Sequence, residues 1–282
     1  MLSRRAAISL TALAALSMSA CGAFQSNNGA SDPGAPLTVV ADAEPHSTLL
    51  KQIQKDGLLG DVKLQIREIS GGVDPNQLVA SGDVDVNFFQ HTPYLKNWNA
   101  EHKSDLIDAG AVHIEPLGLY SKKINKVDDI PQNANIALPA DATNQARALF
   151  LLADAGLFTM DVKATDPNVD YAKITEKNIT ANPKQVTFTK IDRPQLFASL
   201  SDPKITLSVV NGNYALEGGL NPGKDALVLE KAADNPYVNI LATRPALQKD
   251  PRVVKLAQAL RDPKTKTFIQ DTYKGSVLPA QG

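Results

Sequence analysis

The stretch Val86–Tyr94 gathers side chains suited to binding a small polar molecule. A short apolar run with two aromatic rings leads into an amide, the imidazole of His91 and then Pro93. Because proline is tolerated in the first turn of a helix, this pattern predicts a strand that runs directly into a helix near His91. Small ligands bind at such carboxyl ends of strands in open α/β folds. The alternative is that Phe88 and Phe89 are ordinary core residues, since aromatic residues are usually buried. His91 would then be a surface residue whose hydrogen bonds are satisfied.

Arg147 is a charged residue within the first turn of an otherwise apolar helix that we expect to begin near Thr143. A positive side chain is slightly unfavourable near the positive end of the helix dipole, and a bound anion would reverse that penalty. The planar guanidinium also pairs bidentately with a carboxylate. The position therefore predicts a carboxylate site, with an exposed, solvated arginine as the alternative.

Asparagine side chains occur where two further strands meet their connections. Asn211 and Asn213 directly follow the apolar run Thr206–Val210, which is typical of a fully buried strand, and Asn239 lies in another extended stretch. An amide offers both a donor and an acceptor, which suits a zwitterion. The alternative for Asn211 is an ordinary Asn-Gly turn.

Other chemistries find less support in the sequence. The four histidines show no i, i+2 or i, i+4 pair for a local metal site, although three of them could converge in space. A zinc or manganese receptor therefore stays open as an alternative. No G-x-S-x-G elbow, P-loop or dinucleotide glycine pattern occurs, so we expect neither an enzyme nor a cofactor. The histidines are His46, His91, His102 and His113.

The composition is that of a globular protein with a substantial core. Of 282 residues, 43% are hydrophobic and 21% are charged. Lys and Arg number 29 against 30 Asp and Glu, so the chain lacks the basic excess expected of a nucleic-acid partner.

Residues 1–20 read as an export signal, with two adjacent arginines before an apolar run, Ala6–Met18, that is too short to span a bilayer. Cys21, the only cysteine, follows small residues and resembles the lipidated cysteine of a bacterial lipobox. We expect residues 21–36 to be the lipidated cysteine and a flexible tether. This predicts a protein anchored by lipid to the extracytoplasmic face of the cell membrane, in the periplasm if an outer membrane is present.

From Leu37 onward, short β-rich runs alternate with helical stretches, which predicts an α/β fold of about nine strands and seven helices. Two α/β lobes with a ligand cleft between them fit this number of elements. We expect the chain to cross between the lobes near Tyr120 and near Asn239, with Ala111–Tyr120 forming a strand pair or a crossover. The predicted limits are residues 37–119 plus 240–282 for the first lobe and 120–239 for the second.

Five segments at colinear spacing together resemble the MetQ/NlpA family of methionine-binding lipoproteins, and the resemblance extends from Leu37 to about Pro279. It implies a two-lobed fold like that of periplasmic binding proteins. It also implies a substrate-binding protein of an ABC importer, which delivers methionine to a membrane permease with cytoplasmic ATPase subunits. The segments are Asn87–Leu95, Tyr120–Lys123, Asp141–Leu149, Val210–Ala215 and Pro236–Asn239.

The resemblance also implies which residues contact the ligand. Arg147 would hold the α-carboxylate, the asparagine amides would complete the hydrogen bonds of the zwitterion, and three rings would enclose the thioether. A sulfur at an aromatic edge contributes roughly 0.3 to 1.5 kcal/mol. The positions that match the family's contacts are Phe89, His91, Tyr94, Asn144, Arg147, Asn211 and Asn239.

One departure concerns the predicted pocket wall. Where the family usually carries an aromatic residue, this chain has Gly71–Val73. Gly72 leaves that wall bare, so D-methionine, an oxidised methionine or a methionyl dipeptide could use the space. A surface lipoprotein for adhesion, with a vestigial pocket, is the alternative from another functional class.

Overall fold

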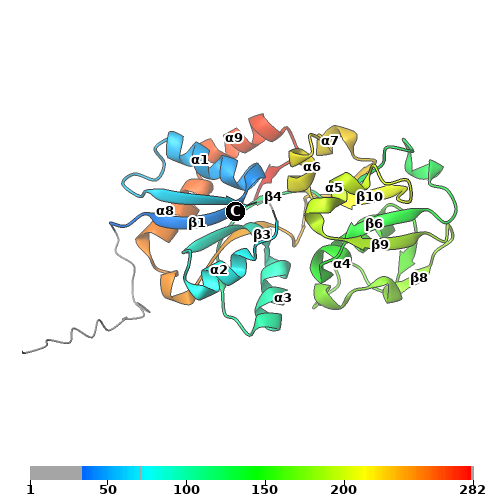
Figure 1. The fold of residues 1–282 in the computed structure, drawn as a ribbon, viewed down its shortest axis with the longest axis horizontal. Helices are drawn as coiled ribbons and strands as arrows, with labels where there is room; N and C mark the ends of the chain where they lie inside the picture. Colours follow the sequence, from blue (N-terminus) through cyan, green and yellow to red (C-terminus); the bar gives the residue numbers. More distant parts are fainter. Residues whose placement is uncertain (1–33, 70, 281–282) are drawn as a thin grey trace, which may run out of the picture.

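The computed structural model describes residues 34–69 and 71–280. The predicted signal peptide, the lipidation site Cys21 and most of the predicted tether lie outside these residues. None of the described helices is both long and apolar enough to cross a lipid bilayer. The described chain forms two α/β lobes that lie side by side along the long axis of the molecule (Figure 1).

The first lobe is built on a six-stranded sheet. In spatial order its strands are β13 (Leu278–Pro279), β4 (Ile107–Ile114), β12 (Asn239–Thr243), β3 (Val86–His91), β1 (Leu37–Asp42) and β2 (Leu64–Ile69). Its helices are α1 (Thr48–Lys55), α2 (Pro75–Ser81), α3 (Thr92–His102), α8 (Pro251–Leu260) and α9 (Pro263–Tyr273). Because side chains alternate between the two faces of a strand, Val39 packs with α1, α8 and α9, whereas Val40 packs with α2 and α3 on the opposite face.

The second lobe is built on a five-stranded sheet. In spatial order its strands are β11 (Val228–Leu229), β5 (Gly118–Tyr120), β10 (Leu207–Val210), β6 (Asn135–Pro139) and β9 (Thr187–Ile191). Its helices are α4 (Ala142–Asp154), α5 (Leu196–Ser199), α6 (Gly212–Glu217) and α7 (Pro222–Asp225). Ile136 and Leu138 of β6 pack with α4, and Ala137 packs with α5 and α6 on the other face.

Short elements complete the fold. β7 (Thr159–Met160) and β8 (Ile179–Ala181) form a small two-stranded sheet. The short helical turns are η1 (Ala43–Ser47), η2 (Val127–Asp129), η3 (Tyr171–Lys173), η4 (Glu176–Asn178), η5 (Arg193–Gln195) and η6 (Pro245–Leu247).

Two connections join the lobes. The chain leaves the first sheet at Ile114 and enters the second at Gly118, and it leaves β11 at Leu229 and returns to the first sheet at Asn239. Ala111–Tyr120 is therefore a crossover and not a strand pair. The predicted lobe limits, residues 37–119 plus 240–282 for the first lobe and 120–239 for the second, remain a prediction.

The predicted α/β class is confirmed. The prediction of about nine strands is too low, because the described residues form thirteen. β7, β8 and β13 are only two or three residues long, which is too short for an alternating pattern to reveal them.

Leu149 provides a test of the core of the second lobe. It belongs to α4, and its side chain is fully buried against the sheet. Leu149→Ala should lower the free energy of unfolding by about 2–5 kcal/mol, since the cavity is lined by neighbours that relax only partly. Val254→Ala at an exposed position of α8 is the control and should change it by less than about 0.5 kcal/mol. Urea denaturation measures both, and similar losses in the two variants would contradict the packing described.

Candidate functional site

The predicted site residues lie at or just beyond strand ends. His91 is the last residue of β3, Asn211 directly follows β10, and Asn144 belongs to α4, which follows β6. Asn239 opens β12, and because β12 is antiparallel to β3, Asn239 pairs with His91. The fold thus brings the carboxyl ends of three strands and the start of a fourth to the junction of the lobes.

A hydrogen-bonded group connects His91, Asn144 and Asn211. The Nδ1 atom of His91 accepts a bond from the backbone N–H of Tyr94 at 3.1 Å, so its Nε2 carries the proton. That Nε2 donates to Asn144 Oδ1 at 3.2 Å, and Asn211 Nδ2 donates to the same oxygen at 2.9 Å. The Oδ1 atom of Asn211 is buried and has no partner among the described residues. An acceptor therefore remains for a ligand's N–H.

Arg147 is buried, with 2% of its surface exposed, so the alternative of a solvated arginine is wrong. Its Nε and Nη2 donate to the carboxylate of Glu230 at 2.9 and 2.5 Å, and Nη2 also donates to the carbonyl of Glu115 at 2.7 Å. Its Nη1 takes part in none of these bonds. Such pairing offsets the several kcal/mol that burial of a lone charge would require.

The expectation that Arg147 sits in the first helical turn needs correction. α4 begins at Ala142, with Asp141 as its N-cap, so Arg147 is the sixth residue and lies in the second turn. The helix dipole acts mainly on the first turn. A protein carboxylate, Glu230, is thus the main electrostatic partner of this guanidinium.

Aromatic rings surround the polar group. Phe89 and Tyr94 meet edge to face with their centroids 5.7 Å apart, and His91 and Tyr237 do so at 5.0 Å. The guanidinium of Arg147 lies 4.6 Å from the centroid of Tyr237, a cation–π contact. Tyr237 thereby links Arg147 to His91.

Asn239 faces a different set of side chains. Its Oδ1 lies 3.3 Å from His46 Nε2, which is also 3.2 Å from Glu115 Oε1. His113 Nε2 lies 2.6 Å from the same oxygen. The ligand atoms of His46, His113 and Glu115 all lie within 4.8 Å of one another, which is the spacing of a potential metal site. Because both Nε2 atoms point at one carboxylate oxygen, the arrangement is equally that of a carboxylate that accepts hydrogen bonds from two imidazoles.

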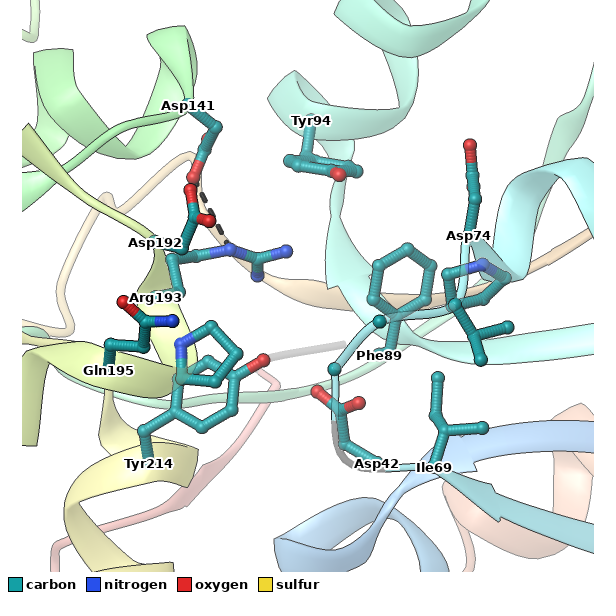
Figure 2. Close-up of a pocket in the computed structure, with 15 residues that line it drawn as sticks. Asp42, Ile69, Asp74, Phe89, Tyr94, Asp141, Asp192, Arg193, Gln195 and Tyr214 are labelled. Atoms are coloured by element: carbon teal, nitrogen blue, oxygen red, sulfur yellow. Dashed lines mark ion pairs between the residues drawn. The ribbon is translucent and has the colours of Figure 1, made fainter.

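The cleft between the lobes has a volume of about 590 Å³, within the range of small-molecule sites. Phe89 and Tyr94 line it, whereas the other five predicted residues are buried and are not among its lining residues. Figure 2 shows side chains of both lobes pointing into this space. The first lobe contributes Asp42 and Ile69, and the second contributes Asp141, Arg193 and Tyr214.

Four residues of the site were not predicted as ligand contacts. Glu230 and Tyr237 bind and cover Arg147, and Asp42 and Arg193 point into the cleft. Asp42 ends β1, Arg193 lies two residues after β9, and Glu230 directly follows β11. A charged residue at or just after the end of a short β-rich run was the available signal for Asp42, Arg193 and Glu230. Tyr237 lay within one of the segments that carry the family resemblance.

Burial shifts the titration of groups around the cleft. Burial, aided by the positive charge of Arg147, lowers the pKa of His91, and burial lowers the pKa of His46 to about 4. Burial raises the pKa of Asp42 to about 7, with the charge of Arg193 opposing this shift. Both histidines are therefore neutral at pH 7, and Asp42 changes charge near that pH.

The lowered pKa of His46 predicts a pH-dependent contribution to stability. The folded value of about 4 lies below the unfolded value of roughly 6.5, so the unfolded chain binds the proton first as pH falls. The contribution is present above pH 6.5 and is lost between pH 6.5 and 4. The loss of stability caused by His46→Gln should thus be about 2 kcal/mol smaller at pH 5.0 than at pH 7.5.

Urea denaturation of wild type and variant at the two pH values measures this difference. Gln65→Ala, at an exposed residue that does not titrate, is the control and should have the same effect at both. An equal effect of His46→Gln at both pH values would contradict the neutral, buried state of His46.

Comparison with known proteins agrees with this architecture. The model of the NlpA lipoprotein family matches residues 37–281. The methionine-binding lipoprotein MetQ of Bacillus subtilis is 38% identical over 264 residues, which cover 93% of each chain. The membrane lipoprotein TpN32 of Treponema pallidum is 34% identical over 242 residues. This alignment covers 84% of the present chain and 86% of TpN32.

Solved structures give the same result. A nutrient-binding protein of Burkholderia cenocepacia, determined with bound methionine, superposes with a TM-score of 0.80 at 35% identity. The match covers 87% of this chain and all of that one. The family model and these relatives span nearly the whole described chain, so the protein belongs to the NlpA lipoprotein family.

Proposed function

We propose that this protein is the substrate-binding lipoprotein of an ABC importer and that it captures methionine in the cleft between its lobes. The observation that carries the proposal is the hydrogen-bonded group of His91, Asn144 and Asn211 beside the rings of Phe89 and Tyr94, with Arg147 joined to it through the ring of Tyr237. The names of its relatives support the same ligand, since one is a methionine-binding lipoprotein and another was solved with methionine.

In the proposed complex each group of the ligand finds a matching partner. The α-carboxylate accepts a bond from Arg147 Nη1, because the other nitrogens of that guanidinium bind Glu230 and Glu115. The α-ammonium donates to the unpaired Oδ1 of Asn211. The thioether lies against Phe89 and Tyr94, where sulfur–aromatic contacts favour it.

The cleft location suggests how transport would begin. Its walls come from both lobes, so a ligand that contacts both stabilises their closed arrangement. We propose that a membrane permease with ATPase subunits recognises that arrangement. The lipid on Cys21 would hold the protein at the extracytoplasmic face of the membrane.

The alternatives have less support. A binding protein, and not an enzyme, fits a site that consists of an ion pair, amides and rings. For the metal receptor, His46 and His113 meet at Glu115, but His91 binds Asn144 and the ring of His102 stacks on Trp98. Nothing specific in the described residues favours an adhesion protein over a transport protein.

Arg147→Ala tests the carboxylate assignment. Removal of the guanidinium should weaken L-methionine binding about 100-fold or more, because it removes a charge-assisted bond to a buried carboxylate. Titration calorimetry on ligand-stripped protein measures the affinity, and Arg67→Ala, at an exposed arginine, is the control. Unchanged affinity in a folded Arg147→Ala variant would refute the assignment.

Since Arg147→Ala also leaves Glu230 without its partner, a change in the ligand provides an independent test on the wild type. L-methioninamide keeps the ammonium and the thioether but lacks the carboxylate. It should therefore bind at least about 100-fold more weakly than L-methionine. Equal binding of the two would show that no cation holds the carboxylate.

A further inference from the structure

Glu230 is a carboxylate of the protein that binds the guanidinium we assign to the ligand. It directly follows β11 and lies in the second connection between the lobes. Its Oε1 accepts a bond from Arg147 Nε at 2.9 Å, and its Oε2 accepts one from Arg147 Nη2 at 2.5 Å. Two parallel bonds of this kind are the strong, bidentate form of an arginine–carboxylate pair. Arg147 therefore already has a carboxylate partner within the protein.

The position of Glu230 is fixed from the first connection as well. The backbone N–H of Glu230 donates to the carbonyl of Leu117 at 2.9 Å, and the N–H of Leu117 donates to Glu230 Oε2 at 3.1 Å. The exposed fractions of the paired side chains are 2% for Arg147 and 13% for Glu230. Because little water surrounds the pair, its charges are weakly screened and act strongly on a third charge nearby.

A second carboxylate, that of Glu115, also acts on Arg147. It accepts hydrogen bonds from His46, His113 and the backbone N–H of Asn213, which favours its ionised form. Burial opposes the charge of Arg147, but attraction by Glu230 and Glu115 outweighs burial and raises the pKa of the guanidinium. The positive charge of Arg147 is thus compensated by the protein before any ligand binds.

A ligand carboxylate at Arg147 Nη1 would share one guanidinium with Glu230. Two carboxylates that bind neighbouring nitrogens of the same group repel each other, and this repulsion is large where water is scarce. Glu230 therefore has two opposite effects on the ligand. It holds Nε and Nη2 and so orients Nη1, and its negative charge repels the carboxylate that Nη1 would bind.

We infer that the repulsion is the larger effect and that Glu230 limits the affinity for the ligand, which allows the ligand to be released. In the ligand-free protein Glu230 compensates the buried charge of Arg147, and in the complex it competes with the ligand for that charge. A residue that only oriented Arg147 would act in the opposite direction, because its loss would weaken binding. This inference rests on the proposed function, since it takes Arg147 as the partner of the ligand carboxylate.

Glu230→Gln tests the inference, because glutamine keeps the shape and one acceptor oxygen of the side chain but not its charge. Titration calorimetry on ligand-stripped protein should show that the variant binds L-methionine about tenfold or more tightly than wild type does. L-methioninamide, which lacks the carboxylate, should gain nothing from the substitution. Unchanged or weaker binding of L-methionine by the folded variant would overturn the inference, as would an equal gain for the amide.

Two further variants separate charge from geometry. Glu230→Asp shortens the side chain but keeps its charge, so it should not reproduce the gain in affinity for L-methionine. Glu68→Gln makes the same chemical change at an exposed carboxylate that pairs with Lys51, and it should leave the affinity unchanged. A gain in Glu230→Asp as large as that in Glu230→Gln would show that the charge of Glu230 is not the cause.

Stability provides a second measurement, because Glu230→Gln leaves the buried charge of Arg147 with less compensation. In urea denaturation the ligand-free variant should be less stable than wild type, and saturating L-methionine should stabilise it more than it stabilises wild type.

If the variant folds only with L-methionine present, the release of radiolabelled ligand from the complex should be about tenfold slower than from wild type. A variant that L-methionine fails to stabilise would overturn the inference. Methionine binding by wild type without a gain in Glu230→Gln refutes only the role of Glu230, whereas no binding by wild type refutes the proposed function as well.

Discussion

The buried guanidinium of Arg147 is the interaction on which the junction of the two lobes depends. It comes from α4 of the second lobe and binds Glu115 and Glu230, which lie in the two connections that join the sheets. A charge with 2% exposure is stable only when it is paired, and removal of one partner from such a pair typically costs about 3–5 kcal/mol. The same side chain therefore fixes both connections, and its Nη1 is the nitrogen that we propose for the ligand carboxylate.

Strand geometry explains why the other polar groups gather beside it. β3, β6 and β10 all end at the junction, and the antiparallel β12 begins there, opposite His91. The residues that follow these ends cannot continue the sheet and turn into helices, which leaves their side chains free to bond one another. Asp42 and Arg193 reach the cleft in the same way, from the ends of β1 and β9. The cleft therefore forms where the strand ends of the two sheets face each other.

Much of this arrangement could be predicted from local patterns. Pro93 marked the boundary between β3 and α3, and the apolar run before Asn211 marked a buried strand that ends at the site. Long-range ion pairs leave no such pattern: Glu230 lies 83 residues from Arg147, and neither residue predicts the other. The position of Arg147 in the second helical turn also depended on where Asp141 caps α4, a boundary that the sequence defines only to within a residue or two.

A crystal structure of the protein with bound L-methionine would show whether Arg147 holds the ligand. We expect the ligand carboxylate to lie within hydrogen-bond distance of Arg147 Nη1, while Glu230 still binds Nε and Nη2. A carboxylate bound to Arg193 instead, with Arg147 held only by Glu230 and Glu115, would contradict it.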